Sequence, residues 1–172
     1  MNKNIESRKG IEKKRVLFVC LGNICRSPAA EGIMKQMVYD DPELRGRIVV
    51  DSAAIGAWHV GQLPDHRMRE HAAARGYNLN SHARQVKPDD FDHFDIVFGM
   101  DEENLADLNR VARNAEDRKK IRCLANYLTS HTSYSTVPDP YYGSGKDFDI
   151  ALDLIEDALT EVLRRMKEGI EI

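Results

Sequence analysis

The sequence predicts an α/β fold with three layers, in which a parallel sheet carries helices on both faces. Two observations indicate this fold. Short segments that are almost wholly apolar alternate with longer segments of helical periodicity along the chain. Strands with continuous apolar runs are typical of a parallel sheet buried on both faces. Such folds bind ligands at the carboxyl ends of their strands, so we expect the functional site in the loops there.

The first half of the chain shows this alternation twice. Residues 15–20 form a short apolar run that predicts a strand, and residues 47–54 predict a second one. A helical pattern begins at Pro28, and its apolar face contains Ala30, Ile33, Met34, Met37 and Val38. Asp65–Arg75 predicts a second helix, which ends at Gly76.

The second half continues the pattern. Residues 94–100 predict a third strand, and residues 101–113 predict a helix capped by its first aspartate. The same order of strand and helix repeats with residues 119–128. A helix with apolar residues at helical spacing over 150–166 ends the chain. The turn-rich segment before it, residues 129–147, is long enough to indicate a functional loop.

Length and composition indicate one domain, residues 15–172, behind a polar N-terminal extension, residues 1–14, for which we expect disorder. The net charge of −3 argues against nucleic acid as a partner. No segment approaches the roughly 18 apolar residues of a membrane span, and the extension lacks the apolar core of a signal peptide. We therefore expect a cytoplasmic protein without membrane insertion.

The cysteines and histidines of the chain limit the kinds of reaction and metal site that it can have. Three cysteines in a cytoplasmic chain are poor material for a disulfide framework, so reactive roles are open for Cys20, Cys25 and Cys123. A role as small buried apolar residues is the alternative for each, and it is favoured for Cys123. The six histidines show no metal-binding spacing, so we expect no metal and no cofactor.

The segment Cys20–Pro28 has the features of an anion-binding loop. Ser27 and Pro28 predict a helix start, with the serine as N-cap and the proline at the first helical position. The loop before them therefore lies at a helix N-terminus, where free backbone N–H groups attract anions. Gly22 allows the backbone to curl, and Asn23 tolerates left-handed dihedral angles.

Two side chains in this loop indicate a reaction at phosphorus. Arg26 can offer a planar fork of donors to two oxygens of a tetrahedral oxyanion. The same positive surroundings favour the thiolate form of Cys20, which is then placed for in-line attack on a bound phosphate. A bare C-x5-R pattern arises by chance, but the preceding strand, the Gly-Asn pair and the following Ser-Pro make this one specific.

The long loop offers an acid for the leaving oxygen. Asp139 stands between two prolines, which stiffen the backbone around its carboxyl group, and Tyr141 and Tyr142 beside it would supply apolar walls. A plain turn is the usual role of an Asp-Pro pair. The local residues leave both interpretations open.

From about Arg15 to about Lys167, the chain resembles the low-molecular-weight protein tyrosine phosphatase family. Four segments carry the resemblance: VCLGNICRSP, DSAAIGAWHVG, ARQVKPDDFDHFDIVFGMDEENLADL and DPYYG. It implies a four-stranded parallel sheet with flavodoxin-like winding, of the phosphotyrosine protein phosphatase I-like type. It also implies a hydrolase that releases inorganic phosphate from phosphotyrosine proteins, phosphotyrosine peptides and small aryl phosphates. We expect this enzyme to be a monomer.

The resemblance also implies roles for individual residues. Cys20 would be the nucleophile that forms a phosphocysteine, Arg26 would bind phosphate, and Asp139 would be general acid and then general base. The rest of the phosphate-binding loop would be Leu21, Gly22, Asn23, Ile24, Cys25 and Ser27. Asn23, Ser27 and Ser52 would form a supporting hydrogen-bond network, and Trp58, Tyr141 and Tyr142 would line the substrate cleft. Cys25 would protect the nucleophile by a reversible disulfide, a form of redox regulation.

The sequence departs from the family pattern at one supporting position. Many relatives carry a histidine three residues before the arginine of ARQV, where this chain has Ser81, and a histidine follows at His82. Which of the two replaces the usual contact is open. The acidic runs DEEN and PDD are interpreted as solvated faces and helix starts.

Three alternative functions remain beside phosphotyrosine hydrolysis. Arsenate reductases of this fold need two further cysteines near the end of the third strand, where FGMDEENL has none. Phosphoarginine phosphatases carry threonine where this chain has Ile24. A non-catalytic phosphopeptide-binding module would need neither Cys20 nor Asp139.

Overall fold

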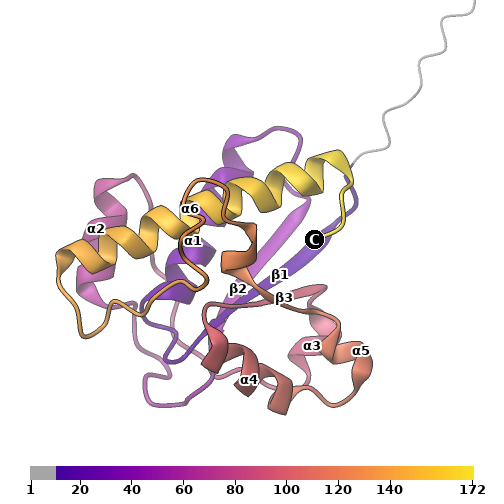
Figure 1. Ribbon diagram of the computed structural model, residues 1–172, viewed down its shortest axis with the longest axis horizontal. Helices are drawn as coiled ribbons and strands as arrows, with labels where there is room; N and C mark the ends of the chain where they lie inside the picture. The colour runs from indigo at the N-terminus through magenta and orange to yellow at the C-terminus, as the bar shows by residue number, and fades with distance from the viewer. Residues whose placement is uncertain (1–10) are drawn as a thin grey trace, which may run out of the picture.

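The computed structural model describes residues 11–172 (Figure 1). Residues 1–10, most of the expected N-terminal extension, lie outside the described residues. In chain order the elements are β1 (Lys14–Cys20), α1 (Arg26–Asp40), β2 (Ile48–Ala54), α2 (His66–Ala74), α3 (Asp90–His93), β3 (Ile96–Gly99), α4 (Glu102–Val111), α5 (Ala115–Arg118), β4 (Ile121–Cys123), the 3-10 helix η1 (Leu124–Tyr127) and α6 (Gly145–Glu168).

The sheet has four parallel strands in the order β2-β1-β3-β4. The central strand β1 places Phe18 opposite Ser52 of β2 on one side and opposite Phe98 of β3 on the other. This order confirms the predicted four-stranded sheet with flavodoxin-like winding. It also brings the loops after β1 and β3 next to each other, at the position where such folds bind ligands.

Helices cover both faces of the sheet, which confirms the three-layer sandwich (Figure 1). Along β1, Val16 and Phe18 pack into one hydrophobic cluster with α1, α2 and α6, whereas Leu17 and Val19 pack into a second cluster with α3 and α4. All four side chains are fully buried. Because successive residues of a strand point to opposite faces, burial on both faces requires a continuous apolar run.

Several helix ends follow the predicted signals. The Asp65 carboxylate caps α2 by accepting from the backbone N–H of Arg67, and α6 begins with a capping box between Ser144 and Asp147. Gly169 ends α6 with a φ of 69°, a left-handed conformation that favours glycine. Among residues 11–172, no helix combines the length and apolar composition needed to cross a lipid bilayer.

The expected N-cap at Ser27 is wrong. Helix α1 already begins at Arg26, and no side chain caps it. The Ser27 hydroxyl instead lies 3.0 Å from the Cys20 sulfur and accepts a hydrogen bond from the Asn23 amide. These contacts occupy the hydroxyl group, so the local capping preference gives way to the loop that precedes the helix.

Within residues 119–128 the strand is limited to β4, and a 3-10 helix follows it. One further expectation needs correction. The PDD run is not a wholly solvated face, because Asp90 is only 6% exposed. Its carboxylate accepts hydrogen bonds from the Arg84 guanidinium and from the backbone N–H of Lys87, which compensate the buried charge.

Candidate active site

Cys20 is the last residue of β1, and the loop after it leads directly into α1. Asn23 has a φ of 56°, the left-handed conformation expected of it. A Cβ atom at Gly22 would lie 2.9 Å from the His59 ring, so a side chain there would have to displace that ring. The loop therefore curls over the helix N-terminus as predicted, with the Cys20 side chain 3% exposed.

The structure brings together the three residues of the expected supporting network. The Asn23 amide nitrogen donates to Ser27 Oγ at 2.8 Å and to Ser52 Oγ at 2.9 Å. Ser27 Oγ lies 3.0 Å from the Cys20 sulfur, which also accepts a 3.4 Å hydrogen bond from the Ser27 backbone N–H. The sulfur is thus surrounded by groups that can stabilise a negative charge.

The network continues beyond the residues that sequence reasoning named. Ser52 Oγ donates to the buried Glu31 carboxylate at 2.6 Å, and the Arg84 backbone N–H donates to Asn23 Oδ1 at 3.2 Å. Ser81 is half-buried and His82 is exposed. Among the hydrogen bonds of residues 11–172, Glu31 and Arg84 provide the outer contacts, and neither Ser81 nor His82 takes the place of the family's histidine.

Arg26 is a buried cation at the centre of the site, 2% exposed. Its Nη1 donates to Asp101 Oδ2 at 2.6 Å and to the Val137 carbonyl oxygen at 2.9 Å, and its Nη2 lies 3.5 Å from Asp139 Oδ2. Burial alone would lower the pKa of Arg26, but the Cys20 sulfur and the two carboxylates raise it above its ordinary value. The guanidinium therefore stays charged.

Asp101 is a site residue that the sequence interpretation missed. It caps α4 as predicted, since its Oδ1 accepts from the backbone N–H of Asn104. Its other oxygen, however, holds Arg26, and Asn104 is itself buried, so the DEEN run is not simply a solvated face. The sequence places Asp101 only after a predicted strand; the observed pairing of β3 with β1 is what sets it beside the loop after Cys20.

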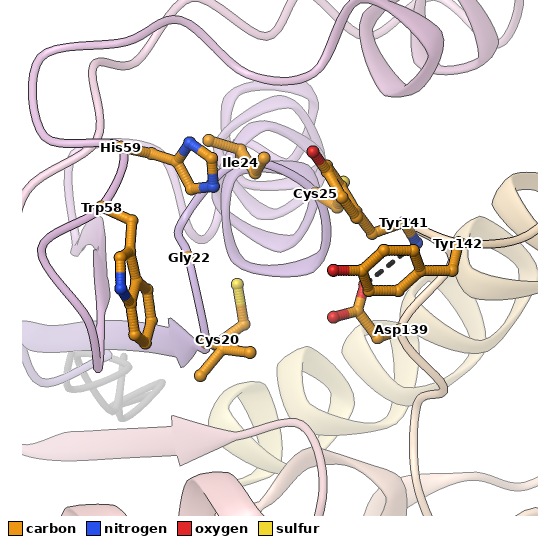
Figure 2. Close-up of a pocket in the computed structure, with 10 residues that line it drawn as sticks. Cys20, Gly22, Ile24, Cys25, Trp58, His59, Asp139, Tyr141 and Tyr142 are labelled. Atoms are coloured by element: carbon orange, nitrogen blue, oxygen red, sulfur yellow. Dashed lines mark hydrogen bonds between the residues drawn. The ribbon is translucent and has the colours of Figure 1, made fainter.

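Asp139 lies across the pocket from Cys20 (Figure 2). Its segment is fixed through Val137, whose N–H donates to the Met100 carbonyl oxygen at 2.8 Å and whose own carbonyl oxygen accepts from Arg26. Asp139 Oδ1 accepts from the Tyr141 N–H at 3.1 Å, and the side chain is 37% exposed. The carboxyl group is thus held in the wall of the pocket that Cys20 also lines.

Aromatic side chains form the walls of this pocket, which has a volume of about 320 Å³. Trp58 stands on one side and Tyr141 and Tyr142 on the other, with the Cys20 sulfur between them (Figure 2). The two tyrosine rings meet edge to face, with centroids 4.9 Å apart. All three predicted cleft residues line the pocket, together with Leu21, Gly22, Ile24 and Cys25 of the loop.

His59 also lines the pocket, although sequence reasoning did not select it. Its Nδ1 lies 2.9 Å from Gln62 Oε1, and its ring faces the tyrosine wall, 6.5 Å from the Tyr141 ring. Its position next to Trp58 on the same loop is the only sequence signal that could have placed it here.

The three cysteines differ in their surroundings. Cys25 is buried in the pocket wall, and burial, with the charges of Asp65 and Cys20, raises the pKa of its thiol well above the usual range. Cys123 is half-buried outside this pocket, and burial raises the pKa of its thiol too. Within residues 11–172 we find no cluster of three or more His, Cys, Asp or Glu side chains suited to a metal ion.

Comparison with known proteins identifies the family. A family model described as low molecular weight phosphotyrosine protein phosphatase matches residues 15–171. The chain belongs to this family. A low molecular weight phosphotyrosine protein phosphatase from Gallus gallus is 43% identical over 139 residues, which are 80% of this chain and 86% of the relative. In this phosphatase, Cys20 stands at the expected position of the phosphate-binding loop.

Solved structures of related phosphatases agree with the fold. A crystal structure of a protein tyrosine phosphatase from Entamoeba histolytica matches with a TM-score of 0.86 at 39% identity, over 91% of this chain and 99% of that one. A Drosophila arginine phosphatase matches with a TM-score of 0.80 at 33% identity, over 87% of this chain and 96% of that one. Proteins named as tyrosine phosphatases and a protein named as an arginine phosphatase therefore share this architecture.

Proposed function

We propose that this phosphatase hydrolyses phosphotyrosine in proteins and peptides, and small aryl phosphates, through a phosphocysteine intermediate on Cys20. The main support is the Arg26 Nε atom, which is buried and has no hydrogen-bond partner among residues 11–172. A buried donor without an acceptor costs about 1–3 kcal/mol, which a bound oxyanion would recover. This donor belongs to a guanidinium fixed beside the thiol, so the anion would lie over the sulfur.

The first displacement forms the phosphocysteine. The Cys20 thiolate attacks phosphorus in line with the bond to the tyrosyl oxygen, a phosphorus–sulfur bond forms, and the phosphorus–oxygen bond breaks. Asp139, protonated before the step, gives its proton to the leaving oxygen, which departs as a phenol. Arg26 and the backbone N–H groups of the loop bind the phosphoryl oxygens.

The second displacement regenerates the enzyme. Asp139, now a carboxylate, accepts a proton from a water molecule that attacks the phosphocysteine. The phosphorus–sulfur bond breaks, inorganic phosphate is released, and the sulfur leaves as a thiolate. The Ser27 hydroxyl and N–H, 3.0 Å and 3.4 Å from the sulfur, stabilise the charge that returns to it.

The aromatic walls support tyrosine as the residue that carries the phosphate. Trp58 and Tyr142 are 68% and 96% exposed, so both can pack against the ring of a substrate at little cost in rearrangement. Cys20 also lines the pocket between them. Inorganic phosphate and an aryl ring would therefore occupy adjacent parts of one cleft.

Phosphoarginine hydrolysis is the second candidate. The likeness to a Drosophila arginine phosphatase favours it. Ile24 opposes it, because phosphoarginine phosphatases carry threonine at this position, and here the side chain adds an apolar surface to the pocket. Arsenate reduction lacks support, since Cys123 is the only cysteine outside the loop. A binding module needs neither the thiol nor the acid.

The deciding experiment compares the release of phosphate from matched peptides that carry phosphotyrosine, phosphoserine or phosphoarginine, under reducing conditions. We expect fast turnover of phosphotyrosine, a fall of about a hundredfold or more in Asp139→Asn, and a radioactive phosphoenzyme on Cys20 after acid quench. A preference for phosphoarginine would support the second candidate. The absence of turnover with every substrate would favour the binding module.

We also propose how the enzyme is regulated by oxidation and in which compartment it acts. Peroxide would transfer one oxygen atom to the Cys20 thiolate, giving a sulfenic acid and a hydroxide ion, and the Cys25 thiol would condense with this sulfenic acid, expelling a water molecule and forming a disulfide. An external thiol would reverse the reaction. We further propose that the enzyme is cytoplasmic and monomeric; the dependence on a reduced nucleophile and the three free cysteines support the cytoplasmic setting.

A further inference from the structure

Glu31 is a buried carboxylate that the proposed reaction does not use. It lies on α1, facing the end of β2, and its side chain is 6% exposed. One oxygen accepts from Ser52 Oγ and the other from Lys35 Nζ, each at 2.6 Å. A buried carboxylate is costly unless it is paired and hydrogen-bonded, so its position next to the catalytic network needs a physical reason.

The carboxylate fixes the direction of a chain of hydrogen bonds. An ionised carboxylate only accepts, so the single proton of the Ser52 hydroxyl points to Glu31. The Ser52 oxygen is then left to accept from the Asn23 amide nitrogen. Asn23 is held in this orientation from its other end too, because its Oδ1 accepts from the Arg84 backbone N–H.

The same direction continues to the nucleophile. The second N–H of the Asn23 amide donates to Ser27 Oγ at 2.8 Å, so the Ser27 oxygen is an acceptor on that side. Its proton is free for the Cys20 sulfur at 3.0 Å, which is nearer than the alternative acceptor, the Ala53 carbonyl oxygen at 3.5 Å. A hydroxyl that donates to sulfur stabilises the thiolate.

Lys35 holds the Glu31 carboxylate in place: its Nζ donates to one oxygen at 2.6 Å, which leaves the other oxygen facing Ser52. Lys35 lies one helical turn after Glu31, and in residues 11–172 it is the one cation within salt-bridge distance of that carboxylate. Its side chain is 55% exposed, beside a surface pocket of about 270 Å³ that Ser81 also lines. Without this ammonium group the carboxylate loses the donor that fixes its orientation, and its hold on the Ser52 proton weakens.

We propose that Glu31 is a positioning residue for Cys20: it orients the Ser52–Asn23–Ser27 chain so that Ser27 donates to the thiolate, with Lys35 as its counter-ion. The role rests on the proposed function only in that Cys20 is the nucleophile. It involves no contact between Glu31 and the substrate. The surface amine of Lys35 is thereby linked to the sulfur through buried hydrogen bonds.

The test is the rate of alkylation of Cys20 by iodoacetamide as a function of pH, followed by peptide mass to separate it from Cys25 and Cys123. We expect Glu31→Gln to move the midpoint of this curve upward by about one pH unit, equivalent to tenfold lower reactivity below the midpoint. An effect of charge alone would move it downward, because the substitution removes an anion and leaves Lys35 positive. A downward shift or an unchanged curve overturns the proposal.

The matched control is Glu161→Gln, a helix carboxylate paired with Arg164 and Arg165 on α6, which should leave the curve unchanged. Because alkylation needs no phosphatase turnover, a failure of phosphotyrosine hydrolysis overturns the proposed function and leaves this result readable. The acid limb of kcat/KM should move with the alkylation midpoint.

A second set of variants covers the case in which Glu31→Gln does not fold. We expect Lys35→Met to raise the midpoint by about half a unit, equivalent to threefold, and Lys35→Arg to restore it. In a Ser52→Ala background the same Lys35→Met change should have no further effect, since the link is cut. Equal curves for Met and Arg at position 35, or an effect that persists without Ser52, overturn the proposal.

Discussion

The carboxylate of Asp101 joins the phosphate-binding loop to helix α4. Its Oδ2 accepts a 2.6 Å hydrogen bond from Arg26 Nη1, while its Oδ1 accepts from the first turn of α4. A single side chain thus holds the guanidinium and caps a helix. The angle at which Arg26 meets a phosphate depends on a residue from a different strand–helix unit.

Asp101→Asn and Asp101→Ala separate these two roles. Both should lower kcat/KM about tenfold or more, because the guanidinium is no longer held in place. Only the alanine variant should lose about a further 1 kcal/mol of unfolding free energy, since asparagine still caps α4. Steady-state kinetics and urea unfolding measure the two effects. The exposed neighbour Glu102→Gln is the control, and wild-type kcat/KM in Asp101→Asn contradicts the prediction.

Cys20→Ser separates binding from chemistry. A serine hydroxyl is not ionised at neutral pH, so turnover should disappear, whereas Arg26 and the loop N–H groups remain. The affinity for inorganic phosphate, measured by calorimetry, should stay within about tenfold of the wild type. Loss of both turnover and phosphate binding would show that the thiol maintains the loop.

Cys25→Ser tests the proposed disulfide. After a pulse of peroxide and treatment with a thiol, the wild type should recover its activity and the variant should recover far less, because the Cys20 sulfenic acid has no partner before further oxidation. Mass spectrometry should find a Cys20–Cys25 disulfide in the wild type and a sulfinic acid in the variant. Equal recovery of both proteins rules out this role.

Gly56 provides the space in which the Trp58 indole lies. A Cβ atom at position 56 would fall 1.8 Å from the Trp58 ring, so Gly56→Ala must displace the indole from the pocket wall. We expect KM for a phosphotyrosine peptide to rise about threefold or more, as in Trp58→Ala, with inhibition by inorganic phosphate unchanged. A weaker phosphate inhibition in Gly56→Ala would instead indicate damage to the loop.

Asp157 ties the start of the acid-bearing segment to α6. Burial alone would raise its pKa, but hydrogen bonds from His131 and Thr129 hold that pKa well below its usual range. Because the folded-state pKa is depressed, the stabilisation is complete above the unfolded value of about 3.9 and is lost as the pH falls through the folded value.

Asp157→Asn should therefore lower the unfolding free energy by about 1–3 kcal/mol at pH 5–7. The difference from the wild type should shrink below about pH 4. Urea unfolding at several pH values measures it. A difference that grows with acidity would contradict the assignment of the stabilisation to the ionised carboxylate.

The parts of the site that are local in sequence could be predicted. The run from β1 through the loop to α1 carries its own signals, and Cys20, Asn23 and Arg26 lie as expected. Asp139 needed the family resemblance, because an Asp-Pro pair by itself also fits a plain turn. The structure adds the pairing of its segment with Met100, which the sequence pattern does not contain.

The parts that depend on distant contacts could not be predicted. An acidic residue near a helix start usually faces water, and the sequence does not show that Asp101 meets Arg26 75 positions away. Glu31 gave no signal either, because its burial depends on Ser52 of the neighbouring strand. The helix-capping interpretation of Ser27 failed for a related reason, since the hydroxyl is taken up by Cys20 and Asn23.

The hydrogen bond between Arg26 and the Val137 carbonyl oxygen joins segments 111 positions apart. All strand pairs of the sheet are parallel, so each one also closes a long loop, and chains with such contacts fold slowly. On the ribosome, the nucleophile loop emerges long before the segment that carries the acid. A nascent chain therefore holds a thiol and an arginine without the carboxyl group that completes the site, and catalytic competence is gained late, when the C-terminal helix docks.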